Sequence, residues 1–187
     1  KQALEDTARL LESLFEQTIA MMNEGASLNT ILTNIHIPQD LAERPYLQPV
    51  YDEPEFIVRN IWRRYGGWYD GMPSHLKPAS KTSLGAEIAQ LAGGGQQLAA
   101  RAVELSKKGD HRVACHLVDW AFTALPDDET VKAAVDTVYT ARAQAESSTM
   151  AMGIFLSAAR ESGAGPEGEA GFVFDLQDQR GRNRGNH

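Results

Sequence analysis

Apolar residues spaced three and four positions apart constrain this chain more than any other feature of its sequence. An α-helix turns once in 3.6 residues, so such spacing gathers the apolar side chains into one stripe. Gly25 follows the first stripe at a position where glycine ends many helices, and a second, shorter helix is predicted after Ser27. No alternation of apolar and polar residues persists long enough to predict a strand, so the expected class is all-α. The first stripe comprises Leu4, Ala8, Leu11, Phe15, Ile19 and Met22.

A proline-rich stretch separates these helices from the rest of the chain. Proline has no amide hydrogen and restricts the residue before it, so helices rarely pass through such a stretch. We expect an ordered, extended strap across residues 37–54 rather than a flexible linker, because the stretch also carries apolar side chains that can pack. The prolines are Pro38, Pro45, Pro49 and Pro54, and the apolar residues are Tyr46, Leu47, Val50 and Tyr51.

Helix is predicted to resume at Pro54, a favourable first-turn residue, and to end at Gly66-Gly67. The next six residues, 68–73, combine the turn residues Asp70, Gly71 and Pro73 with two large aromatic side chains. Large aromatic rings in a turn require either a packed surface or a ligand.

The second half of the chain is predicted to be multi-helical, with antiparallel helix pairs. Expected helices cover residues 83–92, 96–108, 111–125, 128–146 and 148–161, and Gly93-Gly94-Gly95 is interpreted as a hinge between two of them. A Gly-rich and charged stretch, residues 162–187, is expected to be a flexible tail.

One helical hairpin in this half follows the spacing of a tetratricopeptide repeat. That repeat places small residues where two helices touch, glycine at the turn and proline after the second helix. A single unit does not establish a solenoid, and an ordinary helical bundle remains the alternative. The matching residues are Ala102, Leu105, Gly109, Ala114, Val118, Ala121 and Pro126.

Composition excludes several functional classes. The 187 residues carry a formal net charge of -7, which argues against general affinity for nucleic acid or anionic membranes. No apolar run approaches the roughly 20 residues that span a bilayer, so an integral membrane protein is not expected.

The single cysteine, Cys115, allows no internal disulfide. Because the sequence starts with Lys1, we expect an excised or processed piece of a longer protein.

The run from Glu55 to Gly71, EFIVRNIWRRYGGWYDG, is the most informative segment. It resembles the segment that opens the dimerisation domain of the alkyl sulfatases of the metallo-β-lactamase superfamily. The resemblance continues through MPSHLKP, LAGG and KGDHRVA, and covers roughly residues 1–160. One departure is Met72, where the family usually has Asn after Asp-Gly; this change weakens any turn cap or substrate-channel contact that the Asn provides.

The resemblance implies an enzyme of three parts. A metallo-β-lactamase domain holds two zinc ions, a helical domain dimerises and closes over the active site, and a sterol-carrier-like domain helps to recruit the alkyl chain. This chain resembles the second part. We therefore expect residues 1–54 to link to a catalytic domain of the same polypeptide and residues 55–161 to form the dimerisation domain. Periplasmic or secreted location is compatible with the resemblance, but the compartment stays undecided.

The residues themselves predict no catalytic or metal centre in this chain. Zinc hydrolysis in this superfamily requires a dense His-x-His-x-Asp-His cluster, which is absent, so zinc is expected only in the catalytic domain. His111 and Cys115 lie four residues apart on one helical face, which allows the start of a zinc site, but a cysteine buried in a helical core is the favoured interpretation.

The candidate substrate-binding residues are Tyr69, Tyr65 and Arg59, with the tyrosines preferred in that order. The resemblance implies that a tyrosine of this region approaches the sulfate, and tyrosine hydroxyls and arginine donate hydrogen bonds to such oxygens. The alternative is that the aromatic rings pack an interface while Arg59, Arg63 and Arg64 pair with Glu53 and Glu55.

The favoured function is therefore the dimerisation and active-site-closing region of an alkyl sulfatase, a homodimer that is inert without its zinc domain. Two alternatives remain open. One is a tetratricopeptide-like adaptor that binds a protein partner without enzymatic role. The other is a degenerate relative that serves a different hydrolase domain.

Overall fold

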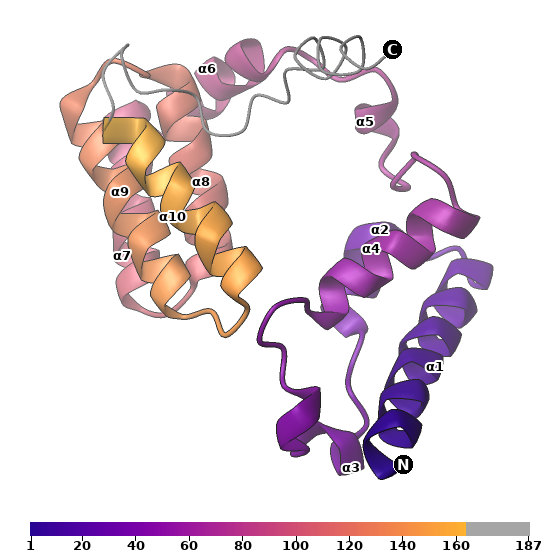
Figure 1. Cartoon of the computed structure of the whole chain (residues 1–187). Coiled ribbons are helices and arrows are strands. Elements are labelled where there is room, and N and C mark those ends of the chain that lie inside the picture. The colour runs from indigo at the N-terminus through magenta and orange to yellow at the C-terminus, as the bar shows by residue number, and fades with distance from the viewer. Residues whose placement is uncertain (164–187) are drawn as a thin grey trace, which may run out of the picture.

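The structure, a computed structural model, describes residues 1–163 (Figure 1). These residues form helices and connecting turns and contain no strand, which confirms the all-α prediction. The predicted tail at 162–187 lies outside the described residues, except that residues 162 and 163 end the last helix. Within the described part, no helix is long and apolar enough to cross a membrane.

The first group of elements occupies residues 2–65. Gly25, with a φ of +81°, and the bond from the Ala26 amide to the Met21 carbonyl end the first helix where the sequence predicted. Ser27 caps the second helix by accepting a hydrogen bond from the Thr30 amide at 3.2 Å. The elements are α1 (Gln2–Asn23), α2 (Leu28–Asn34), α3 (Gln39–Ala42), the 3-10 turn η1 (Pro45–Leu47) and α4 (Pro54–Tyr65).

Most of the apolar stripe predicted on α1 is not the side that α1 buries; only its last residue, Met22, packs against a core cluster. The buried apolar residues of α1 are Leu10 and Leu14, which pack with Leu41 of α3. Leu4 remains 78% exposed and Leu11 44% exposed. A single neighbouring element cannot cover the apolar surface of a helix that has apolar residues on two sides. Helix α1 therefore packs one side and leaves most of the other open.

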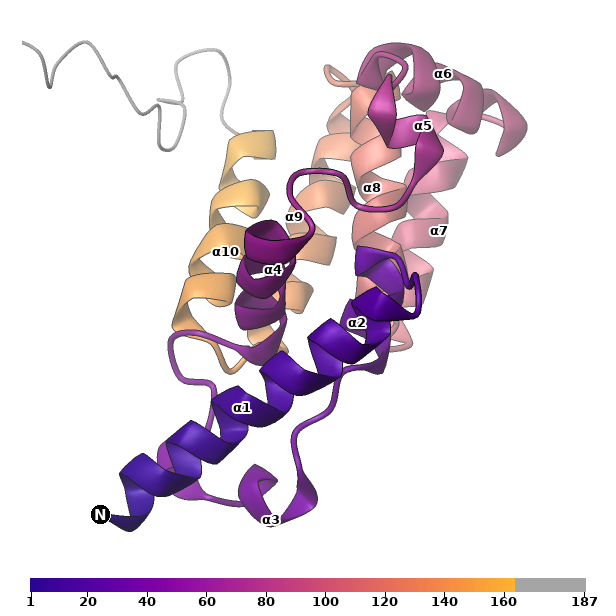
Figure 2. The ribbon, with the colours of Figure 1, turned by 90° about the vertical axis from the view of Figure 1, so that its right-hand side faces the viewer.

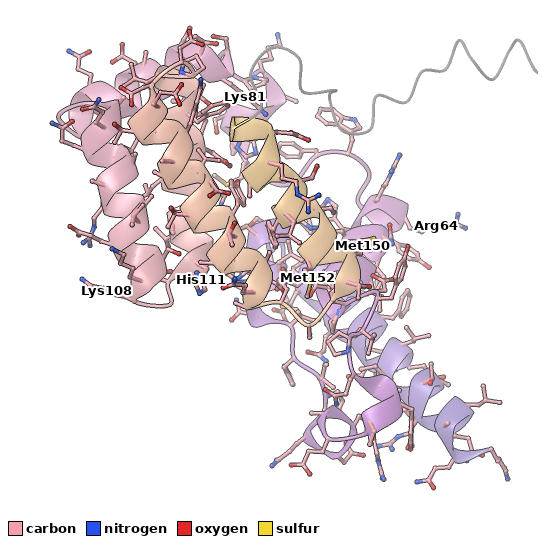
Figure 3. All side chains as sticks on the ribbon, turned by 60° about the vertical axis from the view of Figure 1, so that its left-hand side comes forward. Arg64, Lys81, Lys108, His111, Met150 and Met152 are labelled. Carbon is pink, nitrogen blue, oxygen red and sulfur yellow. The ribbon has the colours of Figure 1, made fainter. Side chains whose placement is uncertain are left out.

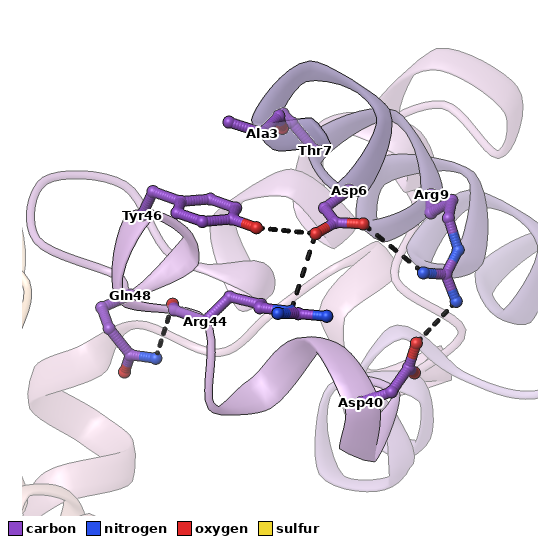
Figure 4. A network of polar contacts seen from close by, with 8 residues as sticks. All are labelled: Ala3, Asp6, Thr7, Arg9, Asp40, Arg44, Tyr46 and Gln48. Atoms are coloured by element: carbon purple, nitrogen blue, oxygen red, sulfur yellow. Dashed lines mark hydrogen bonds and ion pairs between the residues drawn. The ribbon is translucent and has the colours of Figure 1, made fainter. Parts of the chain in front are cut away.

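The strap is ordered but not simply extended, because it contains α3 and η1. Asp6 of α1, only 5% exposed, holds it in place (Figure 4). Its carboxylate accepts a 2.7 Å hydrogen bond from the Tyr46 hydroxyl and lies 3.6 Å from Nε of Arg44. Arg9 bridges the same carboxylate to Asp40. The hydrogen bond to Asp6 raises the pKa of Tyr46.

The second group is a bundle in which α7 to α10 lie side by side, with α6 packed against α8 and α7 (Figures 1 and 2). Successive helices α7, α8, α9 and α10 pack as antiparallel neighbours, as predicted. Its helices are α6 (Lys81–Leu91), α7 (Gly95–Lys107), α8 (His111–Ala124), α9 (Glu129–Gln144) and α10 (Thr149–Gly163). The fully buried side chains at its centre include Ala102, Ala114, Val118, Ala121, Val131 and Val138.

The α7–α8 hairpin places small residues where the predicted repeat wants them. Ala102, Ala114 and Ala121 are each 0% exposed. Gly109 has a φ of +86° at the turn, and the Asp110 amide bonds back to the Leu105 carbonyl. These features agree with close helix contact in either a repeat or a bundle, so the tetratricopeptide assignment stays a prediction.

The groups meet at two places that join residues far apart in the sequence. The strap meets the start of α10, where the Thr149 amide bonds to the Val50 carbonyl at 2.8 Å. Glu55 at the start of α4 pairs with Arg112 at the start of α8. The described structure does not test the predicted division at residues 54 and 55, although α4 packs on α1 and α2.

Candidate functional site

Helix α4 carries the arginines of the candidate site. Pro54 and Glu55 suit its first turn, and Arg63 and Arg64 suit the negative end of its dipole. Arg59, Arg63 and Arg64 are exposed, and none takes part in an ion pair within residues 1–163. Arg64 extends away from the fold (Figure 3). The expected pairing of these arginines with Glu55 is wrong, because Glu55 binds Arg112 instead.

Tyr65 and Trp68 form an exposed aromatic surface at the end of α4. Tyr65 is 60% exposed and Trp68 is 78% exposed. The Tyr65 ring meets Phe15 of α1 edge to face, with 5.6 Å between ring centroids. One side of Tyr65 is therefore packed on α1 while most of the ring remains open.

Tyr69 is half-buried in the turn that follows. Its carbonyl accepts a 3.0 Å hydrogen bond from the Trp62 indole nitrogen, and its ring lies 6.1 Å from that of Trp68, again edge to face. The first of these contacts ties the turn back to α4, so the position of Tyr69 depends on Trp62.

Asp70 organises this turn more than any of the three predicted substrate-binding residues does. Its carboxylate contacts Nδ1 of His75 at 2.5 Å and accepts a hydrogen bond from the Met72 amide at 3.0 Å, and its carbonyl accepts from the Leu28 amide. The hydrogen bond from His75, followed by that from Met72, lowers the pKa of Asp70. The Asp-Gly turn with a histidine five residues later was a local signal for this pair.

Gly71 lets this turn approach α2. Its φ of +89° favours glycine, and a Cβ there would lie 3.1 Å from Cα and Cβ of Ser27. Met72 follows at the N-cap of the short helix α5 (Pro73–Leu76), where its side chain makes no cap hydrogen bond. The Asn that the resemblance implies at this position would be a good N-cap residue, so Met72 forgoes that cap.

A hollow of about 250 Å³ opens between α2, α4 and this turn. In the described part of the chain it brings Arg59 together with the Asp70–His75 pair, but neither Tyr65 nor Tyr69 lines it. The three predicted substrate-binding residues therefore do not converge on one hollow, and their role stays a prediction. The remaining lining residues are Leu28, Asn29, Leu32 and Met72.

His111 and Cys115 have other partners. Nδ1 of His111 lies 3.2 Å from the Ser106 hydroxyl, and Cys115 is half-buried against the bundle core. Burial raises the pKa of Cys115 to about 11, which disfavours the thiolate that binds metals. Among residues 1–163, no three His, Cys, Asp or Glu side chains are grouped as metal ligands.

Most of this chain is similar in sequence to known proteins. Residues 27–165 match the family described as alkyl sulfatase dimerisation. A linear primary-alkylsulfatase from Pseudomonas sp. is 27% identical over 71% of this chain and 25% of its own length. An alkyl/aryl-sulfatase from Saccharomyces cerevisiae is 25% identical over 73% of this chain and 21% of its own length.

The fold also matches a solved structure. A stereoselective inverting sec-alkylsulfatase from Pseudomonas sp. superposes with a TM-score of 0.79 at 22% identity, covering 88% of this chain and 26% of the other. The chain thus spans about a quarter or less of the length of these relatives. On the match over residues 27–165, the chain belongs to the alkyl sulfatase dimerisation family.

Proposed function

We propose that this chain is the dimerisation and active-site-closing region of a zinc-dependent alkyl sulfatase. The observation that carries the proposal is the family match over residues 27–165, together with relatives that are named as alkyl sulfatases. The family description favours self-association over the tetratricopeptide-like adaptor. Because the chain spans a quarter or less of the relatives, the catalytic part is assigned to a metallo-β-lactamase domain of the same polypeptide.

The exposed surface of α4 and the following turn supports the active-site-closing role. Arg59, Arg63 and Arg64 present three positive charges without ion-pair partners in residues 1–163. Trp68 and Tyr65 add apolar area beside them. A cationic and aromatic surface suits an alkyl sulfate, whose head group is anionic and whose chain is apolar.

Within this surface, Tyr69 is proposed as the first candidate to contact the sulfate ester, followed by Tyr65 and Arg59. The Trp62 bond to the Tyr69 carbonyl holds the backbone, which leaves the phenol free to donate to a ligand. Zinc in the catalytic domain would supply the activated water. This chain supplies the surface that positions the ester and excludes solvent.

The kinetic test uses the full-length polypeptide with dodecyl sulfate as substrate. Tyr69→Phe is expected to lower turnover about tenfold, because it removes about 1.4 kcal/mol of transition-state stabilisation. The melting temperature is expected to stay unchanged. Thr137→Val is the matched control, because it also removes one hydroxyl, from an exposed side chain of α9 that bonds only within its own helix. If Tyr69→Phe has wild-type kinetics, Tyr69 only packs and does not contact the sulfate ester.

Two further measurements test the rest of the proposal. Light scattering on this chain is expected to give a homodimer, and a monomer at all concentrations would contradict the dimerisation role. With zinc added, the isolated chain is expected to leave dodecyl sulfate intact. Hydrolysis by the isolated chain would overturn the assignment of catalysis to another domain.

A further inference from the structure

Helix α10 covers one side of the bundle but has an outer side with an unusual composition. The ten residues from Met150 to Ala159 include no charged side chain. The inner side packs on α9, where the Phe155 ring stacks on Tyr139 with 6.0 Å between centroids. An outer helix normally carries charge on its solvent side, and a helix that is apolar all round is normally covered.

The outer side of α10 forms one wall of a groove of about 640 Å³. Figure 3 shows Met150 on this helix at the end nearest the strap. Ile154 is 60% exposed and Tyr51 is 68% exposed, so two large apolar side chains stand open beside each other. The groove residues are Tyr51, Thr149, Met150, Gly153, Ile154, Ser157, Ala158 and Glu161.

Hydrogen bonds across 97 residues of sequence hold the groove together. The buried Ser148 hydroxyl donates to the Tyr51 carbonyl at 2.6 Å and accepts from the Ala151 amide at 3.2 Å. The Thr149 amide bonds to Val50. Because these bonds fix the strap against the first turn of α10, the backbone at Tyr51 is held beside the groove.

Apart from the aromatic surface of Tyr65 and Trp68, which is proposed to face the substrate, open apolar faces lie on α1 and on α10 in the described part of the chain. The α1 face lies within residues 2–23, before the matched family region, whereas α10 lies within residues 27–165. A face that serves self-association in this family is expected inside the region that the family shares. We propose that the α10 groove, with Tyr51, receives α10 of a second copy of this chain about a two-fold axis. This inference rests on the proposed homodimer and names its interface.

A two-fold axis across α10 makes the two helices antiparallel, and the residues suit that arrangement. Gly153, Ser157 and Ala158 are small, so the two helix axes can come within about 8–10 Å of each other, the usual distance between packed helices. Glu161 near the C-terminal end of one α10 then lies beside the N-terminal end of the other, where the helix dipole is positive. Both the charged end and the uncharged middle of α10 therefore face suitable parts of the second copy.

The test is the dimer dissociation constant of this chain, from sedimentation velocity over a concentration series. Ile154→Glu places two carboxylates near the proposed axis and is expected to raise the constant at least tenfold. Gly153→Gln adds bulk without charge and is expected to do the same, and a Cβ at Gly153 meets no atom within 4 Å in the monomer. Leu4→Glu is the matched control on α1, 78% exposed, and is expected to leave the constant unchanged.

Far-ultraviolet circular dichroism and melting temperature establish that each variant is folded. A wild-type monomer would contradict the proposed homodimer itself. A wild-type dimer that persists in both Ile154→Glu and Gly153→Gln would overturn only the α10 interface. If Leu4→Glu alone produces monomers, the dimer interface is on α1 and the inference fails.

Discussion

Arg112 at the start of α8 binds both carboxylate oxygens of Glu55 at the start of α4, across 57 residues of sequence. The paired geometry of guanidinium and carboxylate adds direction to the attraction between the charges. Since α4 belongs to the N-terminal group and α8 to the bundle, this pair is one of the few side-chain contacts that fix the two groups together.

Arg112→Ala is expected to lower the free energy of unfolding by about 1 kcal/mol, measured by urea denaturation. The effect is limited because the Arg112 side chain is 61% exposed and solvent screens the pair. Arg101→Ala is the matched control, because Arg101 pairs with Glu104 within α7 and both side chains are exposed. We expect the control to change stability by less than about 0.5 kcal/mol. Equal losses in both variants would show that Glu55–Arg112 has no special role between the groups.

Ser148→Ala is expected to destabilise the chain by about 1–3 kcal/mol. Its hydroxyl, 0% exposed, both caps α10 and binds the Tyr51 carbonyl, so its loss leaves two backbone groups without this partner. Thr137→Ala is the control, because the exposed Thr137 hydroxyl only bonds within its own helix. Thermal denaturation of both variants measures the difference. A Ser148→Ala variant as stable as Thr137→Ala would contradict the anchoring of the strap.

Gly71→Ala is expected to lose more stability than Gly67→Ala. Both glycines have a positive φ, +89° and +79°, so an alanine at either position costs about 1–2 kcal/mol in backbone conformation. Only at Gly71 does the added Cβ come within 3.1 Å of Ser27. The excess loss of Gly71→Ala in urea denaturation therefore measures the contact between the turn and α2, and equal losses would rule that contact out.

The sequence predicted most helix boundaries because their signals are local. Gly25, Ser27 and Pro54 act within a few residues of the ends that they define. The burial of α1 was not predictable in this way. Its apolar residues form two sides, and which of them is covered depends on Leu41 and Tyr46, which lie far along the chain.

The same distinction holds for the candidate site. Arg59, Tyr65 and Tyr69 were found from their segment, but their separation on the surface follows from the packing of Phe15 against Tyr65 and of Trp62 against the turn. Arg112 as the partner of Glu55 had no local signal at all, because only the fold of the whole chain brings the start of α4 near the start of α8.

Glu53 makes the stability of the chain depend on pH. Burial raises the pKa of Glu53 above its ordinary value of 4.5, and the carboxylates of Glu146 and Glu55 raise it further, while Arg142 and Arg112 act in the opposite direction. A raised pKa in the folded state means that folding favours the protonated acid. The resulting stability is present below the unfolded-state pKa and is lost as pH rises through the folded-state pKa.

Glu53→Gln removes the charge that folding disfavours, so the variant is expected to be more stable than the wild type at pH 7. The gain is expected to be below about 1 kcal/mol, because Glu53 is only half-buried and solvent screens its neighbours. The gain should shrink toward zero as pH falls below 4.5, where the wild-type acid is protonated in both states. Melting temperatures between pH 3.5 and 8 measure it, with Glu16→Gln on the exposed side of α1 as the control for the same charge change. A gain that is constant across this range, or a loss at pH 7, would show that the Glu53 carboxylate is not held against its neighbours as described.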